Sequence, residues 1–358
     1  MKKRILHYIP GFNIGGIESL FLDLVRNIDT DKYEIHLLTE RKVAEDVLEY
    51  LKKNNVMVHE NIYSIKKSII KYYTFILRLL KKEKFNILHI HGFFTRPLIL
   101  VASKYVRTEK IILHAHSTKL EKIELIGKNI SKILLNSDMK YIACSKEAGE
   151  CYFGKDRNIE VITNGIDFNK FRYNLNDKKE YTKNMKLENK KIIGMIGRIS
   201  YPKNHKFAIE IFEKLNKIDK SYVLFLIGSE ADEKEIPQLV KEKGLEDKII
   251  FLGARNDIKE LLSLIDVYLM PSIYEGLSVG LLEAQASGVQ CLISDAITPK
   301  NIVTNNVKAL SLNDSPDIWA KAVIELYNKG REEIDYDSLD KSEYSIKTFV
   351  KKIEKIYD

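Results

Sequence analysis

Short, continuously apolar runs alternate along this chain with segments whose apolar residues recur at helical spacing. Runs of this kind predict strands that are buried on both faces, as in a parallel sheet covered by helices. The first series of predicted strands falls at 4–9, 33–39, 56–59, 87–91, 111–116, 141–144 and 159–162, and the second at 192–196, 223–227, 249–252, 267–270 and 290–293. Two such series predict an α/β protein with two doubly wound, Rossmann-like domains.

A polar segment rich in Lys and Asn, at 169–189, separates the two series. Its weak patterning predicts a domain boundary, so we expect an N-terminal domain over residues 1–170 and a second domain over 171–337. The last segment, 338–358, predicts an amphipathic helix with Tyr344, Phe349 and Ile353 on its apolar side.

The composition is that of an ordinary globular protein, with 45% hydrophobic and 30% charged residues among 358. No apolar run approaches the ~20 residues that a membrane span requires. The N-terminus starts with basic residues, but the apolar part that follows is too short for a signal peptide and reads as a first strand. Three cysteines, Cys144, Cys151 and Cys291, lack metal-binding spacing and indicate a reducing compartment, so we expect a cytoplasmic protein.

The net charge of +8 is unevenly distributed. Residues 1–170 contain 29 Lys and Arg against 20 Asp and Glu, a net +9, while the remainder contains 29 against 30. The segment 64–84 alone holds seven cations and one acid beside apolar residues at helical spacing. This pattern predicts contact with an anionic partner, such as the inner face of the cell membrane or a phosphate-bearing acceptor. The alternative is a helix with its apolar stripe in the core and its lysines in solvent.

The stretch from Glu275 to Glu283 carries more chemical information than any other part of the sequence. Glu275 follows an apolar run, 266–274, that predicts a buried strand ending in a turn, and residues 281–287 predict a helix. Free backbone amides at a helix N-terminus bind anions, and here we expect them at Ser278, Val279 and Gly280. One carboxylate could hold sugar hydroxyls and the other ribose hydroxyls, while the amides hold phosphates. Alternatively, Glu275 is a turn residue and Glu283 a solvated helix position.

A second anion-binding motif follows the first strand of the second series. Gly197 and Arg198 come directly after that strand, and Lys203 lies five residues later. A guanidinium fork and an ammonium group suit a diphosphate, and the carboxyl edge of an α/β sheet is where ligands bind. The alternative is a solvated basic loop.

Several other residues could line a ligand site. Gly15 and Gly16 follow the first strand and would let the backbone approach a phosphate or sugar, although they lack the dinucleotide spacing and could also form a tight helix entry. Asn164 begins an Asn-Gly turn at the end of the first series. Arg255 follows the strand 249–252, and Asp257 next to it could also be a helix N-cap.

Four histidines end two neighbouring strands of the first series: His89, His91, His114 and His116. Histidines two apart on a strand point to one face, so a metal site is conceivable. No carboxylate or cysteine completes a ligand set locally, and histidines in protein cores are common. We therefore expect no metal here.

Taken in order along the chain, these motifs resemble the large family of retaining glycosyltransferases with the GT-B fold, often called family 4, whose members carry the Glu-x7-Glu pattern. The run Tyr-Glu-Gly-Leu-Ser-Val-Gly-Leu-Leu-Glu-Ala-Gln-Ala-Ser-Gly is similar to the branch that builds bacterial capsular polysaccharides and exopolysaccharides. The resemblance implies two Rossmann-like domains with an interdomain cleft, and a C-terminal helix that packs back on the first domain.

The resemblance also implies roles for individual residues. Catalytic roles are assigned to Glu275, His116, Arg198 and Lys203. Donor-binding roles are assigned to Gly15, Gly16, Arg255, Ser278, Val279, Gly280 and Glu283. The acceptor side is assigned to His91 and Asn164. The glycine that usually follows the lysine in this family is replaced here by Asn204, which bears on the shape of that loop.

We therefore predict a retaining hexosyl- or N-acetylhexosaminyltransferase whose donor is a nucleotide-diphosphate sugar, with a UDP-sugar expected. The acceptor would be a growing polysaccharide or a polyprenyl-diphosphate-linked glycan. No metal or other cofactor is expected to be obligatory, because Arg198, Lys203 and backbone amides would stabilise the leaving diphosphate. A GT-B sugar-nucleotide epimerase and a non-catalytic sugar-nucleotide-binding subunit are the alternatives. Nucleic acid is not an expected partner, because the basic residues are not interleaved with an RNA-binding aromatic motif.

Overall fold

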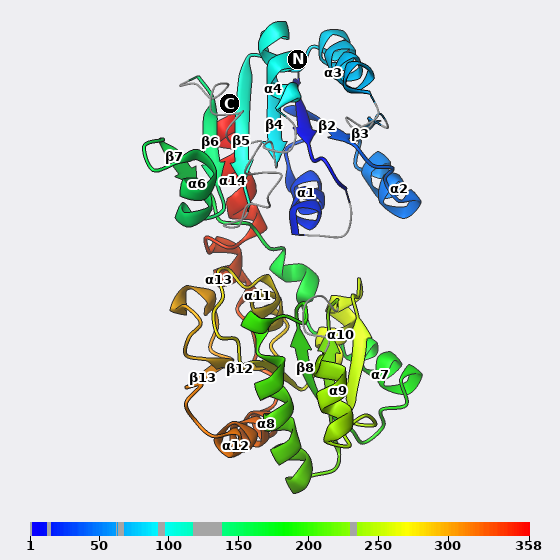
Figure 1. Cartoon of the computed structure of the whole chain (residues 1–358), viewed down its shortest axis with the longest axis vertical. Coiled ribbons are helices and arrows are strands. Elements are labelled where there is room, and N and C mark those ends of the chain that lie inside the picture. The colour runs from blue at the N-terminus through cyan, green and yellow to red at the C-terminus, as the bar shows by residue number, and fades with distance from the viewer. Residues whose placement is uncertain are drawn as a thin grey trace. The chain divides into compact units, whose positions relative to one another are not determined.

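The computed structural model describes residues 2–12, 16–61, 63, 68–91, 97–116, 138–229 and 235–358. The chain divides into two compact units, which are described separately (Figure 1). Unit 1 comprises residues 1–165 and 340–358, and unit 2 comprises residues 166–339. No helix in the described ranges is both long enough and apolar enough to cross a membrane.

Unit 1 is built on a parallel sheet. Its strands are β1 (Lys3–Tyr8), β2 (Tyr33–Thr39), β3 (Met57–Glu60), β4 (Ile87–His91), β5 (Lys110–Ala115), β6 (Lys140–Ala143) and β7 (Ile159–Val161). They lie in the order β3-β2-β1-β4-β5-β6-β7, and every pair is parallel. The chain starts in the middle of the sheet and winds outward in both directions, as in a doubly wound fold.

Helices cover both faces of this sheet. They are α1 (Gly16–Asn27), α2 (Glu45–Lys53), α3 (Ile69–Glu83), α4 (Leu98–Val106), α6 (Lys146–Phe153) and α14 (Ile346–Tyr357). Apolar residues of α1, α2 and α14 share one core with the sheet, and those of α3, α4 and α6 share a second core on the opposite face. Because both faces are buried, the strands need continuous apolar runs, which is the pattern that predicted them.

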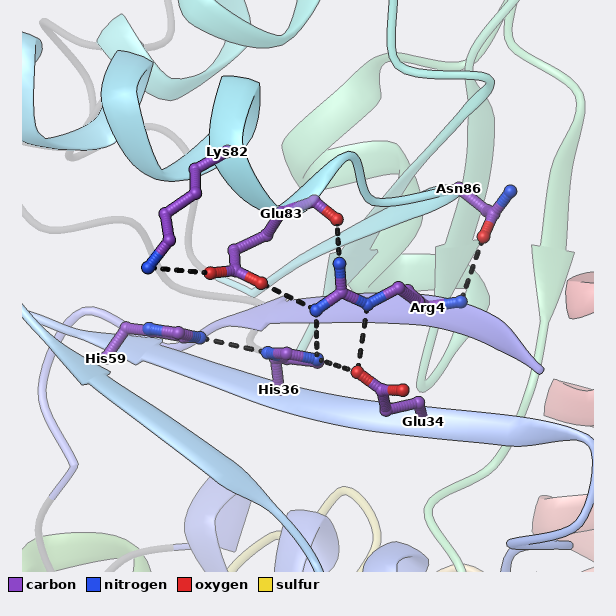
Figure 2. A network of polar contacts seen from close by, with 7 residues as sticks. All are labelled: Arg4, Glu34, His36, His59, Lys82, Glu83 and Asn86. Carbon is purple, nitrogen blue, oxygen red and sulfur yellow. Dashed lines mark hydrogen bonds and ion pairs between the residues drawn. The ribbon is translucent and has the colours of Figure 1, made fainter. Parts of the chain in front are cut away.

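Polar contacts join β1, β2 and α3 on unit 1 (Figure 2). The guanidinium of Arg4 donates to the carboxylates of Glu34 on β2, at 2.9 Å, and Glu83 on α3, at 2.6 Å. The backbone N–H of Arg4 donates to the side-chain oxygen of Asn86 at 3.0 Å. These pairs are partly exposed, so we expect each to contribute modestly to stability.

The C-terminal segment forms two helices rather than the single helix predicted for 338–358, and the second of them packs on unit 1. The first is α13 (Tyr336–Lys341) and the second is α14, shown in red along β5 and β6 (Figure 1). The chain breaks between them because the Ser345 side chain accepts a hydrogen bond from the Lys347 N–H and so begins a new helix. Gly165 permits the approach of α14, since a Cβ there would lie 2.7 Å from the Cα of Ile346.

Unit 2 has the same architecture with six strands. They are β8 (Lys191–Ile196), β9 (Tyr222–Ile227), β10 (Ile249–Gly253), β11 (Val267–Met270), β12 (Gln290–Ser294) and β13 (Val307–Leu310). The order is β10-β9-β8-β11-β12-β13, again parallel throughout. Both units therefore have the doubly wound topology that the sequence predicted, which confirms the fold class.

The helices of unit 2 are α7 (Leu175–Asn184), α8 (His205–Ile218), α9 (Glu235–Glu242), α10 (Ile258–Leu264), α11 (Val279–Ala286) and α12 (Pro316–Lys329). Three short 3-10 turns accompany them: η2 (Phe168–Phe171), η3 (Tyr201–Lys203) and η4 (Pro299–Asn301). The segment 169–189, which separates the two series of strands, contains most of η2 and all of α7. Helix α7 was not predicted because none of its residues is buried, so its sequence shows no apolar stripe.

Candidate active site

The loop from β11 to α11 carries both glutamates singled out in the sequence. Glu275 lies in the loop, and Glu283 is half-buried within α11, which begins at Val279. The helix ends at Ala286, and Gly288 follows it with a φ of +73°, a backbone conformation that glycine adopts without strain.

A buried asparagine on η4 holds this loop in place. The Asn301 Nδ2 donates to the carbonyl of Gly276 at 2.7 Å, and its Oδ1 accepts from the N–H of Ser278 at 2.9 Å. The expectation of a free amide at Ser278 is therefore wrong, because the asparagine side chain already occupies it. In the described part of the chain no hydrogen bond engages the amides of Val279 and Gly280, so these two remain available for an anion.

The start of α11 is tightly packed around Gly280. A Cβ there would lie 3.2 Å from the hydroxyl of Tyr268 on β11 and 3.8 Å from the end of β8 at Ile196. The N-terminus of α11 is therefore held against the carboxyl ends of two central strands. Ligands bind at this edge in open α/β sheets.

The second predicted motif, after β8, reaches the same loop. The Nζ of Lys203 lies 2.8 Å from the Oε1 of Glu275, and the two side chains are only 19% and 13% exposed. The contact is an ion pair without the angles of a hydrogen bond, since Oε1 has no hydrogen-bond partner. Arg198 is exposed and lies on the same loop. The structure thus brings together Lys203 and Glu275, which are 72 positions apart in the sequence.

Gly197 makes room for the lysine, and Gly228 makes room for Gly197. Gly197 has a φ of +151°, and a Cβ on it would lie 2.7 Å from the Cε of Lys203. A Cβ on Gly228 would lie 2.1 Å from the carbonyl oxygen of Gly197. Asn204 then takes a left-handed conformation, with φ 59° and ψ 49°. Asparagine tolerates this conformation better than most residues, so the chain makes this turn without a glycine.

Arg255 makes an ion pair instead of pointing freely into a site. Its Nε donates to Asp257 Oδ1 at 2.7 Å, and the hydroxyl of Tyr181 donates to Asp257 Oδ2 at 2.7 Å. The guanidinium and the tyrosine hydroxyl together lower the pKa of Asp257. Asp257 stands at the N-cap position of α10 but makes no capping hydrogen bond, so its side chain serves the ion pair.

In unit 1, His91 and His116 lie at the carboxyl ends of β4 and β5, and Asn164 follows β7. His91 Nδ1 lies 2.7 Å from His116 Nε2. Burial lowers the pKa of His116 to about 4, and the adjacent Asn164 side chain acts in the opposite direction. Neither His116 Nδ1 nor Asn164 Oδ1 makes a hydrogen bond of normal geometry within the described residues. Three of the predicted residues are thus neighbours on this unit.

The histidines also bear on the question of a metal. Nitrogen atoms of His7, His89 and His91 lie within 4.8 Å of one another, as do those of His91, His114 and His116. Within the first set, His7 Nδ1 lies 3.2 Å from His91 Nε2, and within the second, His91 Nδ1 lies 2.7 Å from His116 Nε2, both hydrogen-bonding distances. At these distances neighbouring rings can share protons, and the absence of an obligatory metal stays a prediction.

The remaining predicted residues are in the N-terminal loop. Gly16 is the exposed first residue of α1, and a Cβ on it would meet nothing within 4 Å. Gly15 lies outside the described residues.

Two residues that support the loop from β11 to α11, called the donor loop below, were not predicted from the sequence. Asn301 is one, and Gln285 on α11 is another: its Oε1 accepts from the N–H groups of Val303 and Thr304, and its Nε2 donates to the Asn301 carbonyl at 2.7 Å. Both side chains are completely buried. For Gln285 the available signal was an amide side chain flanked on both sides by alanine, in a helix that also contains Leu281 and Leu282, because a buried amide needs hydrogen-bond partners.

Comparison with known proteins defines the class. A family model described as Glycosyltransferase Family 4 matches residues 14–170, and one described as Glycosyl transferases group 1 matches residues 176–347. EpsF of Bacillus subtilis (strain 168), a glycosyltransferase by name, is 30% identical over 92% of this chain and 89% of its own. The chain belongs to the glycosyltransferase family that these two models and EpsF define.

Two further relatives and a solved structure are consistent with this assignment. The UDP-Gal:alpha-D-GlcNAc-diphosphoundecaprenol alpha-1,3-galactosyltransferase of Escherichia coli is 26% identical over 84% of this chain and 82% of its own. The capsular polysaccharide biosynthesis glycosyltransferase CapH of Staphylococcus aureus is 23% identical over 99% of this chain and 98% of its own length. HepE of Anabaena, solved in complex with UDP-glucose, superposes with a TM-score of 0.75 at 16% identity, covering 99% of both chains. The resemblance to the capsular and exopolysaccharide branch, and the GT-B fold, are confirmed.

Proposed function

We propose that this glycosyltransferase transfers a hexosyl or N-acetylhexosaminyl group from a UDP-sugar, with retention of the anomeric configuration. The observation that carries the proposal is the Lys203–Glu275 pair beside the open amides of α11, at the carboxyl edge of the unit 2 sheet. This arrangement places a cation, a carboxylate and anion-binding amides within one loop system. Those are the groups that a diphosphate joined to a sugar needs.

Each residue has a proposed role. Arg198, Lys203 and the amides of Val279 and Gly280 stabilise the negative charge that develops on the leaving diphosphate. Glu275 orients the transferred sugar and Glu283 binds the ribose. In unit 1, His116 is assigned to the sugar, and His91 and Asn164 to the acceptor side. Arg255, with Asp257, is assigned to the nucleobase.

Lys203 has to change partners when the donor binds. In the ligand-free protein its ammonium neutralises Glu275 at 2.8 Å. We infer that the diphosphate takes over this ammonium and leaves the carboxylate free to accept hydrogen bonds from sugar hydroxyls. A carboxylate that becomes available only with the bound donor would favour the complete UDP-sugar over UDP alone. No metal is assigned, so activity should survive removal of divalent ions with EDTA.

Binding and product analysis test the donor and the stereochemistry. Calorimetric titration with UDP, GDP and ADP should give measurable affinity for UDP and at least tenfold weaker affinity for the others. NMR of the freshly formed product should show the same anomeric configuration as the donor. Preference for GDP or ADP, or an inverted product, would contradict this part of the proposal.

For the acceptor we propose a growing polysaccharide or a polyprenyl-diphosphate-linked glycan. The support is the names of relatives: the Escherichia coli protein acts on a diphosphoundecaprenol-linked sugar, and CapH belongs to capsular polysaccharide biosynthesis. The catalysed step would then occur at the membrane surface, on the side where nucleotide sugars are made.

We further propose that α3 of unit 1 contacts an anionic membrane. Its apolar stripe faces the core, with Tyr72, Ile76, Leu79 and Leu80 buried. The other side carries Lys71, Arg78 and Lys82, which line a pocket of about 550 Å³ together with Tyr63 and Phe75. Ile69 and Ile70 at the start of the helix are 53% and 73% exposed. Each cation near an anionic surface contributes about 1 kcal/mol, and the exposed isoleucines add apolar area.

Liposome sedimentation tests this contact. Vesicles with acidic lipids should retain the wild type at low salt and release it at high salt. Changing Lys71, Arg78 and Lys82 to Glu should abolish binding. The matched control variant carries the same charge change at three exposed lysines of unit 2, Lys179 and Lys183 on α7 and Lys190 just before β8. This variant should bind vesicles as the wild type does. Equal loss in both variants would mean that net charge, and not α3, determines binding.

A further inference from the structure

Five buried or half-buried histidines form a continuous group on one face of the unit 1 sheet. They are His7 on β1, His89 and His91 on β4, and His114 and His116 at the end of β5. The three strands are neighbours, with His7 opposite His89 and His91 opposite His114. Helix α14 covers this face, and its Tyr357 is completely buried against the histidines.

Tyr357 begins one arm of hydrogen bonds that ends at His116. Its hydroxyl lies 3.0 Å from His7 Nε2. His7 Nδ1 lies 3.2 Å from His91 Nε2, and His91 Nδ1 lies 2.7 Å from His116 Nε2. Successive ring planes differ by 16° and 20°, so each N–H can point at the lone pair of the next ring.

The same hydroxyl begins a second arm. It lies 2.8 Å from His89 Nδ1, and His89 Nε2 lies 3.2 Å from His114 Nδ1. These two ring planes differ by 15°. Tyr357 is therefore the one junction of both arms among the described residues.

All five imidazoles are neutral near pH 7. Burial lowers the pKa of His7 to about 3 and that of His116 to about 4, and it lowers the pKa values of the other three well below the ordinary value. A neutral imidazole has one N–H and one lone pair. Each ring must therefore donate on one side and accept on the other, and neighbouring rings cannot choose independently.

The single proton of the Tyr357 hydroxyl links the two arms. If it is donated to His7 Nε2, His7 carries its proton on Nδ1 and donates to His91, which then donates to His116. The hydroxyl oxygen accepts from His89 Nδ1–H in this pattern, and His114 Nδ1–H donates to His89. All five rings are then protonated on Nδ1. If the hydroxyl proton is donated to His89 instead, the same reasoning places all five protons on Nε2.

The two ends of the array favour the first pattern. With protons on Nδ1, His116 Nδ1–H faces the Asn164 Oδ1, and two buried atoms that lack partners could satisfy each other. The array ends on its other side at His114 Nε2, which is buried and has no partner among the described residues. In the first pattern this nitrogen carries no proton and has only an unpaired lone pair. In the second pattern, His114 Nε2 would carry an N–H without an acceptor. The lone pair of His116 Nδ1 would also face the lone pairs of Asn164 Oδ1, as that amide is oriented here.

We propose that the Tyr357 hydroxyl couples the five histidines into one array, all protonated on Nδ1, and that Tyr357 is a positioning residue for His116. His116 then presents an N–H, because its Nε2 is engaged by His91. In the ligand-free protein this N–H faces Asn164 Oδ1, so a substrate oxygen would have to take the place of that amide oxygen to accept it, and His116 would then be a neutral donor and not a base. This consequence for the substrate rests on the proposed function, whereas the array itself does not.

The pair His36–His59 in the same unit provides a reference, because its hydrogen bonds require protons on Nε2 (Figure 2). His36 Nε2 lies 2.8 Å from the Glu34 carboxylate, which can only accept when ionised, so His36 carries its proton on Nε2. Its Nδ1 must then accept from His59 Nε2–H, at 2.9 Å. The 3.5 Å contact between Arg4 and His36 Nε2 is too long to compete.

Nitrogen-15 NMR of the ligand-free full chain at pH 7 reads the tautomers directly. We expect five histidines with a protonated Nδ1 and an unprotonated Nε2, and the reverse for His36 and His59. The eighth histidine, His205, lies in unit 2 and is outside the prediction. Any one of the five found protonated on Nε2 in the wild type would overturn the proposal.

Changing Tyr357 to Phe tests the junction. The variant removes the acceptor of the His89 N–H, so His89 and His114 should move to the Nε2-protonated form that neutral histidine prefers in water. His7, His91 and His116 should keep their protons on Nδ1, because Asn164 still faces that arm. Unchanged tautomers at His89 and His114 would overturn the role of the hydroxyl.

The matched control is Tyr33→Phe. Tyr33 packs against Tyr357, and its hydroxyl donates to Asp358, so the control removes a neighbouring phenol hydroxyl outside the array. It should leave all five tautomers unchanged. If Tyr357→Phe fails to fold, the wild-type spectrum still decides the proposal. UDP affinity, measured on the same samples, tests the donor site separately, because the tautomers are read without ligand.

Discussion

Replacing Asn301 with Ala should weaken the donor loop at a defined point. The side chain is fully buried and makes two hydrogen bonds to that loop, to Ser278 N–H and to the Gly276 carbonyl. The substitution leaves a backbone donor and a backbone acceptor without partners. It introduces no clash, because it only removes atoms.

The cost can be estimated from those two groups. A buried polar group without a partner costs about 1–3 kcal/mol, and water entering the vacated space recovers part of this. We expect a loss of about 2–4 kcal/mol in the free energy of unfolding. The loop that carries Glu275 and the start of α11 should also lose its fixed geometry, so UDP affinity should fall at least tenfold, or about 1.4 kcal/mol.

Asn306 provides the matched control. It is equally buried in unit 2, and its Nδ2 donates to the carbonyls of Val289, at 2.6 Å, and Gln285, at 3.3 Å. Its partners lie outside the loop of Glu275. Thermal unfolding should therefore show similar destabilisation in Asn301→Ala and Asn306→Ala, and calorimetry at a temperature where both are folded should show weaker UDP binding only for Asn301→Ala. Equal UDP affinity in the two variants would refute the role given to Asn301.

Three further predictions follow from the same contacts. Arg198→Ala and Lys203→Ala should each cost about 2–4 kcal/mol in transition-state stabilisation, and unchanged UDP affinity in the double variant would rule out the diphosphate assignment. Glu283→Gln should mainly raise the apparent KM for the donor and Glu275→Gln mainly lower kcat, whereas equal loss of UDP binding in both would show that the roles are not divided. Gly165→Ala should destabilise unit 1 by about 1–3 kcal/mol in denaturant unfolding, because the added Cβ meets α14 at 2.7 Å, and an unchanged midpoint would mean that α14 is free to move away.

Much of the fold could be predicted because parallel strands buried on both faces need unbroken apolar runs. The boundaries of β2, β4 and β11 are those expected from the sequence. Strand β13 was missed because its four residues, Val307–Leu310, lie at the sheet edge and none is buried, so the run Val-Lys-Ala-Leu is not continuously apolar. Helix α7 was missed for a related reason, since it has no buried side.

The candidate site was predictable only in its local motifs. Glycines, charges and strand ends indicated where a phosphate could bind, and the two loops do meet through Lys203 and Glu275. The partners that hold those loops could not be found in this way. The bond from Asn301 to Ser278 joins residues 23 positions apart, and the contact of Tyr357 with His7 spans 350. Pairings of this kind depend on the folded topology, and no local pattern encodes them.

Acceptor-dependent turnover tests the central claim most directly. The purified chain is supplied with UDP-glucose, UDP-galactose, UDP-GlcNAc and UDP-GalNAc, with and without a short-chain polyprenyl-diphosphate-linked sugar, and the release of UDP and the mass of the lipid product are measured. We predict UDP release from at least one donor only when the acceptor is present, with the lipid heavier by one sugar residue. Conversion of one UDP-sugar into another without acceptor, or tight UDP-sugar binding with no turnover under any condition, would contradict it.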